Sequence, residues 1–582
     1  MTRKRILSVV LAAVLLFSFS ATPVFAADGK EVLSGYFKDA LTKTIGAIME
    51  TFTGIFNRSV TDKGVAVDEK DFVLTDFYSG TDEFLKEPAV GARWSLGYDT
   101  KSLVPENRED YNLYLGGFMA LENGLSNKVK DVYDDMKVRT IALSDGSGRG
   151  ISVFATIDCI GMTNTDIRTI RAQLASFAKE KGINSINIFS THCHSCIDTQ
   201  GLWTQTLKKI PGNLLAAYFG LGEVQKGTDA KYMQFLFERV AASVEEAVSS
   251  MKTGEMTFSE KDIGAEYFNN KNRTTATAVL SDLAKFTFTP DDGSTPTIIA
   301  NMAAHPDVVG LPVKGDDANG QILSGDYVYY IGETLNKAGY NFMFFNGAIC
   351  GIYLGRTPTN DGLELPRRVD ISIRYGREIG RMLLAMSMTE EEIKADPFLS
   401  VTGDTEEQMN SEGYSLWYKE DWQPVAEEKV EPLLNVRVKS LITPVTNNII
   451  LVAGKLRLAN HTLIKNGKDY KLATEIGYAQ LGSHKIVMMP GEISQDLIAG
   501  GASLTKAGSI NKEDFTGKTV YELFGEDTLV FGLANDAIGY VVPDNDYCMG
   551  LAFDHYQESL SLGKNTASFL MSRYEQLASE VG

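Results

Sequence analysis

Residues 184–195 read NSINIFSTHCHS, an apolar segment that runs directly into two histidines, His192 and His194. The apolar part, 184–190, predicts a buried strand that ends just before the first histidine. If the backbone stays extended, side chains two positions apart point to the same side of the sheet. Neutral imidazole is the commonest transition-metal ligand, so the pair predicts one edge of a metal site.

The residues before this stretch place it in a βαβ unit. Residues 150–158 predict another buried strand, and residues 165–181 predict a helix that Gly182 ends. A right-handed crossover between two parallel strands brings His192 to the carboxyl end of the second strand, where open α/β sheets build their sites. We therefore expect an α/β fold with mixed, largely parallel sheets flanked by helices, and a metal site at the carboxyl ends of strands.

Three later segments repeat the pattern of an apolar strand followed by a candidate ligand. They are 296–304 with His305, 485–489 with Glu492, and 528–533 with Tyr540. Taken singly, each residue has a structural interpretation, because a histidine before proline can cap a strand, a glutamate can open a helix, and a tyrosine can belong to the core. Taken together with His192, they can offer two imidazoles, a carboxylate and a phenol to one cation.

Four motifs in this order resemble the neutral/alkaline (non-lysosomal) ceramidases and their bacterial relatives. The motifs are STHCHS at 190–195, NMAAHP at 301–306, MMPGE at 488–492 and LANDAIGYVVPDNDY at 533–547. The resemblance runs from about residue 158 to about residue 563, which is most of the chain. It implies a zinc amidohydrolase that cleaves the N-acyl bond of a sphingolipid.

The resemblance also implies roles for seven residues. It makes His192, His305, Glu492 and Tyr540 the ligands of a Zn²⁺ ion, His194 the acid/base, and Arg273 and Tyr556 the donors that hold the scissile carbonyl. This chemistry is self-consistent, because zinc lowers the pKa of its bound water to ~7 and a nearby histidine can take that proton and return it to the leaving amine. The alternative for His194 is a purely structural hydrogen-bonding role.

The chain departs from the family pattern at several places. Tyr353 stands where the family has a serine, Gly351 stands where it has an aspartate, and residues 195–198 read SCID in place of SGPG. A metal-activated water needs no serine nucleophile, so we interpret Tyr353 as an altered contact to the substrate. The chain also ends soon after Tyr540, so we expect the family's C-terminal immunoglobulin-like domain to be absent.

The first residues predict export. Three basic residues at 3–5 precede an apolar run at 6–19, and a small-residue pattern ends at Ala26. We expect a signal peptide at 1–26, cleavage near Ala26 and a secreted or cell-surface protein, because the run is shorter than the ~20 residues that span a bilayer. Cleavage changes the formal charge from −19 to −22, since it removes three basic residues and no acidic ones. Such a charge excludes nucleic acid as a partner.

The rest of the chain divides into a helical N-terminal arm at 27–85 and a catalytic domain at 86–582. Apolar residues recur at helical spacing along the arm, at Leu41, Ile45, Ile48, Met49, Phe52 and Phe56. This face can dock on the body, cover the site or make transient contact with a membrane surface, and docking is the plainest interpretation. Residues 203–221 are also apolar, and either wall an acyl-chain pocket or belong to the core.

Five cysteines are an odd number for an exported protein, so at least one is expected to be free or paired with another chain. Cys193 and Cys196 alternate with the histidines. They can be zinc ligands, a redox dithiol or small buried residues that line the site.

The sequence therefore predicts an exported, zinc-dependent amidohydrolase that acts on ceramide or a ceramide-like lipid amide. Three alternatives remain. One is a zinc esterase or an amidase for a non-sphingolipid acyl compound. The second is a metal-stabilised lipid-binding protein without turnover, and the third is a thiol-dependent protein that uses Cys193 and Cys196.

Overall fold

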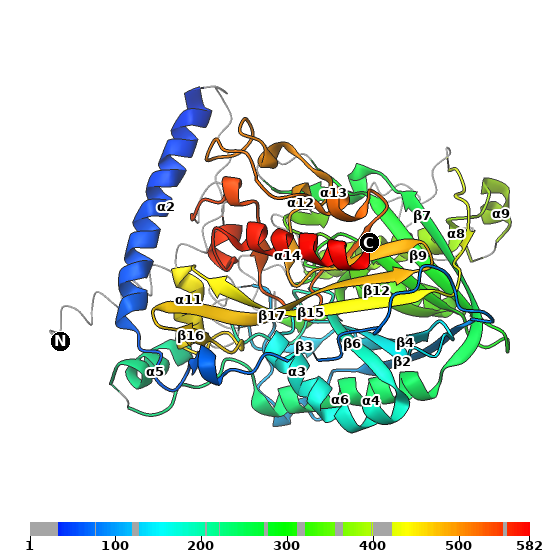
Figure 1. The fold of residues 1–582 in the computed structure, drawn as a ribbon, viewed down its shortest axis with the longest axis horizontal. Coiled ribbons are helices and arrows are strands. Elements are labelled where there is room, and N and C mark those ends of the chain that lie inside the picture. Colours follow the sequence, from blue (N-terminus) through cyan, green and yellow to red (C-terminus); the bar gives the residue numbers. More distant parts are fainter. Residues whose placement is uncertain are drawn as a thin grey trace.

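Two β-sheets packed face to face form the centre of the molecule (Figure 1). The computed structural model describes residues 33–75, 77–118, 127–203, 206–219, 221–272, 278–310, 321–355, 365–396, 398–399, 422–550 and 556–582. The predicted signal peptide at 1–26 and Arg273 lie outside these residues.

The larger sheet runs across the whole body and supplies both strands of the predicted βαβ unit. Its strands, in spatial order, are β12 (Asn341–Asn346), β10 (Thr297–Met302), β9 (Asp282–Pro290), β7 (Lys252–Asp262), β2 (Trp94–Ser102), β4 (Lys137–Ser144), β5 (Ile151–Ile157) and β6 (Ile183–Ser190), and β14 (Glu428–Lys429) joins β7. The predicted α/β class with mixed sheets is confirmed. The prediction of largely parallel strands is not met in this sheet, where only the pairs β12–β10 and β5–β6 are parallel. Parallel neighbours need a helical crossover, whereas β4 and β5 are joined by a short turn.

The smaller sheet is also mixed. Its strands are β1 (Val67–Asp68), β16 (Ile464–Asn466), β17 (Asp469–Leu481), β18 (His484–Met488) and β20 (Leu529–Phe531), and β15 (Leu434–Val445) also pairs with β17. Aromatic rings fill the space between the two sheets below the candidate ligands. The ring of Phe345 lies 4.2 Å from that of Phe531 and 4.8 Å from that of Phe189. These rings fix the ends of β6, β12 and β20 relative to one another.

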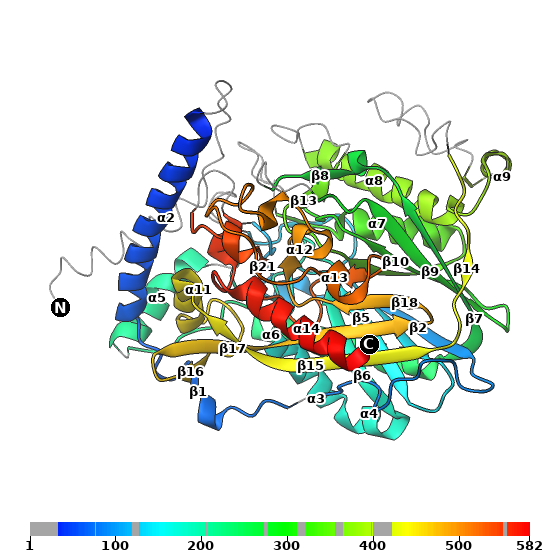
Figure 2. The same cartoon turned by 45° about the horizontal axis from the view of Figure 1, so that its top comes forward.

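Helices cover the outer faces of both sheets, so the body has four layers (Figures 1 and 2). The larger sheet is covered by α3 (Asn164–Gln173), α4 (Ala175–Lys181), α6 (Ala230–Ser249), α7 (Asp326–Lys337) and α8 (Leu365–Ala385), and the smaller by α13 (Val520–Phe524) and α14 (Thr566–Val581). Alternation along β6 explains the layering: Ile186 and Ile188 face the helices, and Phe189 faces the second sheet. The predicted βαβ unit is confirmed, with its helix broken at Leu174 and ended by Gly182 in the left-handed region.

Shorter elements connect these layers and carry several site residues. They are α5 (Thr206–Phe219), α9 (Glu390–Ala395), α11 (Asn448–Lys455), α12 (Asp496–Ala499), β3 (Asp131–Val132), β8 (Phe268–Asn270), β11 (Ile322–Leu323), β13 (Ile352–Leu354), β19 (Glu492–Ile493) and β21 (Tyr540–Val541). Among the described residues, no helix is both long and apolar enough to cross a membrane.

Helix α2 (Leu33–Ser59) lies along one edge of the body (Figure 2). It docks through Phe56 and through Asn57, whose side chain donates to Asn448 at 2.9 Å on α11. The predicted apolar face is only partly covered by the body, because Phe56 is buried whereas Phe52 is 62% exposed and Ile48 is 51% exposed. One edge of this face packs on α11 and the other faces outward.

Candidate metal centre

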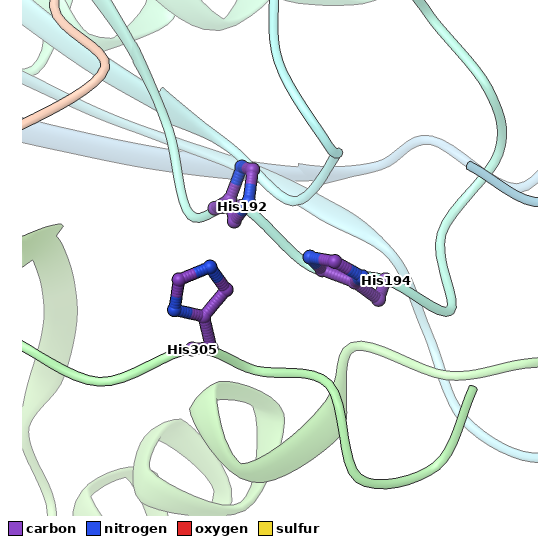
Figure 3. Close-up of side chains that lie close together, drawn as sticks. All are labelled: His192, His194 and His305. Carbon is purple, nitrogen blue, oxygen red and sulfur yellow. The ribbon is translucent and has the colours of Figure 1, made fainter. Parts of the chain in front are cut away.

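Three histidines come together at the carboxyl ends of strands, as the sequence predicts. His192 and His194 follow β6, and His305 follows β10. Their ligand atoms all lie within 4.8 Å of one another, and all three residues are buried (Figure 3). This cluster can hold a metal ion.

The backbone turns sharply at His192. Its φ is +66°, in the left-handed region that L-residues other than glycine rarely adopt. Backbone hydrogen bonds from Thr191 to Ile157 and from Cys193 to Cys159 hold the chain on either side. The expectation of an extended chain is therefore wrong, although the rings of His192 and His194 still meet, with centroids 4.8 Å apart. Strain of this kind is typical of functional sites and persists only where the surroundings enforce it.

Backbone carbonyls orient two of the imidazoles. The Nδ1 of His192 donates to the carbonyl of Ile160 at 2.7 Å, and the Nδ1 of His305 donates to the carbonyl of Ile352 at 2.7 Å. A neutral imidazole that donates from Nδ1 has an unprotonated Nε2, so this geometry allows each ring to present a ligand atom to the site. Metal-ligating histidines are oriented in this way, by a hydrogen bond from the other ring nitrogen.

Glu492 adds a carboxylate oxygen to the two imidazole nitrogens that face the site. Its Oε2 lies 3.2 Å from the Nε2 of His192 and 3.1 Å from the Nε2 of His305. Burial disfavours the charged carboxylate, but the two histidines hold the pKa of Glu492 well below its usual range. With both imidazoles neutral, as metal ligation requires, lone pairs on these three buried atoms would point at one space that a divalent cation can occupy. The residues present thus fit a metal ion.

His194 differs from the other two histidines. Burial, followed by the neighbouring His192 and His305, lowers its pKa well below the usual value, so its ring is neutral. Neither ring nitrogen bonds to a described side chain. A side chain at Gly117 would collide with it, because a Cβ there would lie 2.5 Å from Cγ of His194. The glycine therefore lets the free imidazole stand beside the centre.

Three tyrosines line the same centre. Tyr540 pairs with Glu492 across β19 and β21, and the hydroxyls of Tyr353 and Tyr556 lie 2.6 Å apart. Burial raises the pKa of Tyr556 to about 12 and that of Tyr540 well above its usual value, so both are phenols at neutral pH. Tyr353 also stacks on His305, with ring centroids 4.6 Å apart.

Tyr353 was predicted as a substrate contact and does line the cavity, whereas Asp307 is a site residue that sequence reasoning missed. The signal for Tyr353 was its alignment with the family's serine. Asp307 lines the cavity two residues after His305, and burial raises its pKa to about 6. Nothing in the local pattern marks Asp307, because its place depends on the packing around the histidine.

The centre opens into one cavity of about 480 Å³. Its polar wall carries His192, His194, Glu492, Tyr540 and Tyr556. Its other walls are mainly apolar, and include Phe118, Leu202, Trp203, Ile450, Leu463, Leu472, Leu533, Ile538, Leu560 and Leu562. The two interpretations of 203–221 are therefore both partly met, because Trp203 lines the cavity whereas Leu214 and Ala217 pack in the core with α2.

All five cysteines are buried and none is part of a disulfide. The thiols of Cys193 and Cys196 donate to the carbonyl of Ser324 at 3.2 and 3.4 Å. Burial raises the pKa of Cys196 well above its usual value and that of Cys159 to about 12. This environment supports the interpretation of the pair as small buried residues.

We expect these thiols to be unreactive in the folded protein, because the thiolate is the nucleophile and burial disfavours it. Titration of the native protein with a disulfide reagent should detect none of the five thiols within minutes, and all five after addition of denaturant. Rapid reaction of one or two thiols in the native protein, with loss of function, would instead support the thiol-dependent alternative.

Comparisons with known proteins identify solved structures with a similar fold. No protein-family model and no curated protein matches the chain. Among solved structures, the chain is similar to neutral ceramidase from Pseudomonas aeruginosa, with 12% sequence identity and a TM-score of 0.52 over 84% of this chain and 75% of that one. A ceramidase complexed with C2 matches with the same values. The resemblance in the motifs is thus confirmed at the level of the fold.

Proposed function

We propose that the protein is an exported, zinc-dependent amidohydrolase that cleaves the N-acyl bond of ceramide or a ceramide-like lipid amide. The observation that carries the proposal is the convergence of His192 Nε2, His305 Nε2 and Glu492 Oε2, at 3.2 and 3.1 Å, on one buried space. The likeness of the fold to neutral ceramidase supports it.

His192, His305 and Glu492 would hold the ion, with the phenol of Tyr540 beside them. Two imidazoles and a carboxylate form a donor set that suits zinc. When bound, such an ion supplies Lewis acidity that polarises an amide carbonyl and acidifies water.

The chain's own residues would move the protons. His194 is neutral and free of side-chain partners, so it can accept a proton from the attacking water and return it to the leaving amine. Tyr556 and Tyr353 can donate to the oxygen on which negative charge develops. We assign Arg273 the same role.

The cavity supports a lipid-like substrate. Its apolar walls suit an acyl chain, because ligand pockets are lined mainly by aliphatic and aromatic groups. The outward residues Ile48, Phe52 and Ile55 of α2 support transient contact with a membrane surface. We further propose residues 1–26 as the signal peptide, 27–85 as an arm and 86–582 as the catalytic domain.

A second candidate is an amidase or esterase for a non-sphingolipid acyl compound. Tyr353 favours it, because its ring fills the space beside His305 where the family has a small serine. The same chemistry would then serve a different substrate.

The test is mass-spectrometric detection of fatty acid released from ceramide and from a panel of N-acyl amines and acyl esters. We expect release that a chelator abolishes and added zinc restores. Release that a chelator does not change would contradict the proposed metal chemistry. No release by protein with a full complement of zinc would favour a non-catalytic lipid-binding protein, and the preferred panel member separates the other candidates.

A further inference from the structure

A second polar group lines the cavity, outside the metal centre. It comprises His461 with its chain neighbours Asn460 and Thr462, and with Gln200. The wall around them is mainly apolar, so these side chains form a separate polar cluster, and the proposed chemistry does not use it. Polar groups in an apolar wall fix the orientation and identity of a ligand.

His461 is held by a buried carboxylate. Its Nε2 donates to Oδ1 of Asp536 at 2.7 Å. The same oxygen accepts the backbone N–H groups of Asn164 and Ala537, each at 2.9 Å, and the carboxylate is fully buried. Asp536 cannot turn without losing these bonds, so it fixes the imidazole.

The loop that carries Asp536 is itself constrained. Leu533 and Asn535 have φ values of +49° and +58°, in the left-handed region. The side chain of Asn535 binds β6, where its Oδ1 accepts the N–H of Ile188 at 2.9 Å. The strained loop is thus anchored to the strand that leads into the metal centre, and both polar groups belong to one rigid wall.

His461 presents one unused donor. Burial opposes its charge, but Asp536 raises its pKa above the usual value. Asp166 is the other charged group that raises the pKa of His461. Its two carboxylate oxygens accept hydrogen bonds from the side-chain amide of Asn460, at 2.6 and 2.7 Å. The Nδ1 of His461 bonds to no described residue, and the side chain is 16% exposed. Protonation of the ring, which Asp536 favours, would therefore give this cavity-lining side chain a second N–H that can bind a ligand.

We propose that His461 binds an oxygen anion on the amine half of the substrate, so that the protein prefers N-acyl amino acids to N-acyl amines without a charged head group. The inference rests on the proposed metal-dependent cleavage of an N-acyl bond, and it favours the second candidate, an amidase for a non-sphingolipid acyl compound, over ceramide. A carboxylate fits because it accepts a charge-assisted hydrogen bond, and such bonds are about twice as strong as neutral ones. The apolar walls take the acyl chain, and the metal centre takes the amide.

The test compares an N-acylglycine with an N-acylpropylamine of the same acyl length. We expect the parent to show a kcat/KM about tenfold or more higher for the acylglycine, which is the effect of one hydrogen bond to a charged group. In His461→Gln the ratio should fall at least about fivefold, mainly through a higher KM for the acylglycine, because the remaining hydrogen bond is neutral.

Asp536→Asn separates charge from structure. The amide oxygen can still accept the three hydrogen bonds at Oδ1, but the negative charge that favours imidazolium is gone, so the preference should fall here too. His484→Gln is the matched control, because His484 stacks on Phe258 with ring centroids 3.9 Å apart and lies outside the cavity lining. Its preference should equal that of the parent.

Equal kcat/KM values for the two substrates in the parent, or a preference that survives both variants, would overturn the subsite. Calorimetric binding of the N-acylglycine to parent and variants gives the same comparison without turnover. If no panel member is hydrolysed by zinc-loaded parent, the proposed function fails, and a weaker affinity in His461→Gln still supports the subsite. Equal affinities would overturn it.

Discussion

Glu492→Gln should weaken metal binding at least about 100-fold and abolish activity, since it removes the anionic member of the ligand set. It should also lower the stability of the metal-free protein. The carboxylate, whose pKa the two histidines hold well below its usual range, interacts favourably with His192 and His305, and a neutral glutamine loses that interaction. We therefore expect the variant to melt below the parent in chelator, and further below it in excess zinc.

Metal analysis and thermal melts with and without chelator check this expectation. Glu245→Gln on the exposed face of α6 is the matched control and should behave as the parent. Parental metal content in Glu492→Gln would exclude Glu492 as a ligand. That outcome would leave His192, His194 and His305 as the ligand set, since their ligand atoms also lie within 4.8 Å of one another.

His194→Ala should keep the metal and lose about 10²- to 10⁴-fold in kcat, the contribution of a positioned general acid/base. The reason is the position of His194, whose ring stands beside the ligands with centroids 4.8 Å from His192 and 5.6 Å from His305. The measurement pairs zinc content with kcat for the best substrate of the panel.

Metal analysis of Glu492→Gln and His194→Ala together shows whether Glu492 or His194 joins His192 and His305 as a ligand. Loss of metal in His194→Ala would make this histidine a ligand, and would leave the proton transfer to another group. A rate within a few-fold of the parent, with metal retained, would reduce His194 to a structural role. A His192→Ala and a His305→Ala variant should lose metal under either assignment.

Local signals in the sequence predicted the elements that carry the site. The periodicity of 165–181 and the glycine after it predicted the crossover, and the structure has its cap, because the Thr163 side chain accepts the N–H of Asp166. His192 and His305 do follow the strands that the sequence marked, whereas Glu492 and Tyr540 begin the separate short strands β19 and β21. These features depend on residues within one or two turns of chain, which a single sequence contains.

Features that depend on distant chain segments were not predictable. The directions of the strands follow from pairings such as β10 with β9, which no local pattern encodes. The left-handed turn at His192 depends on backbone bonds to β5 and the residues after it. Likewise, the outward side of α2 became visible only once its contact with α11 was known.

The candidate metal ligands come from both halves of the sandwich, and His305 and Glu492 are 187 residues apart in the chain. A nascent chain therefore contains no binding site until both sheets have formed and closed on the phenylalanines between them. Contacts of such long range form slowly during folding, and ligands that meet only in the native state couple ion capture to the last step of assembly. Uptake of the proposed metal ion would therefore report the step of folding at which the two sheets close on each other.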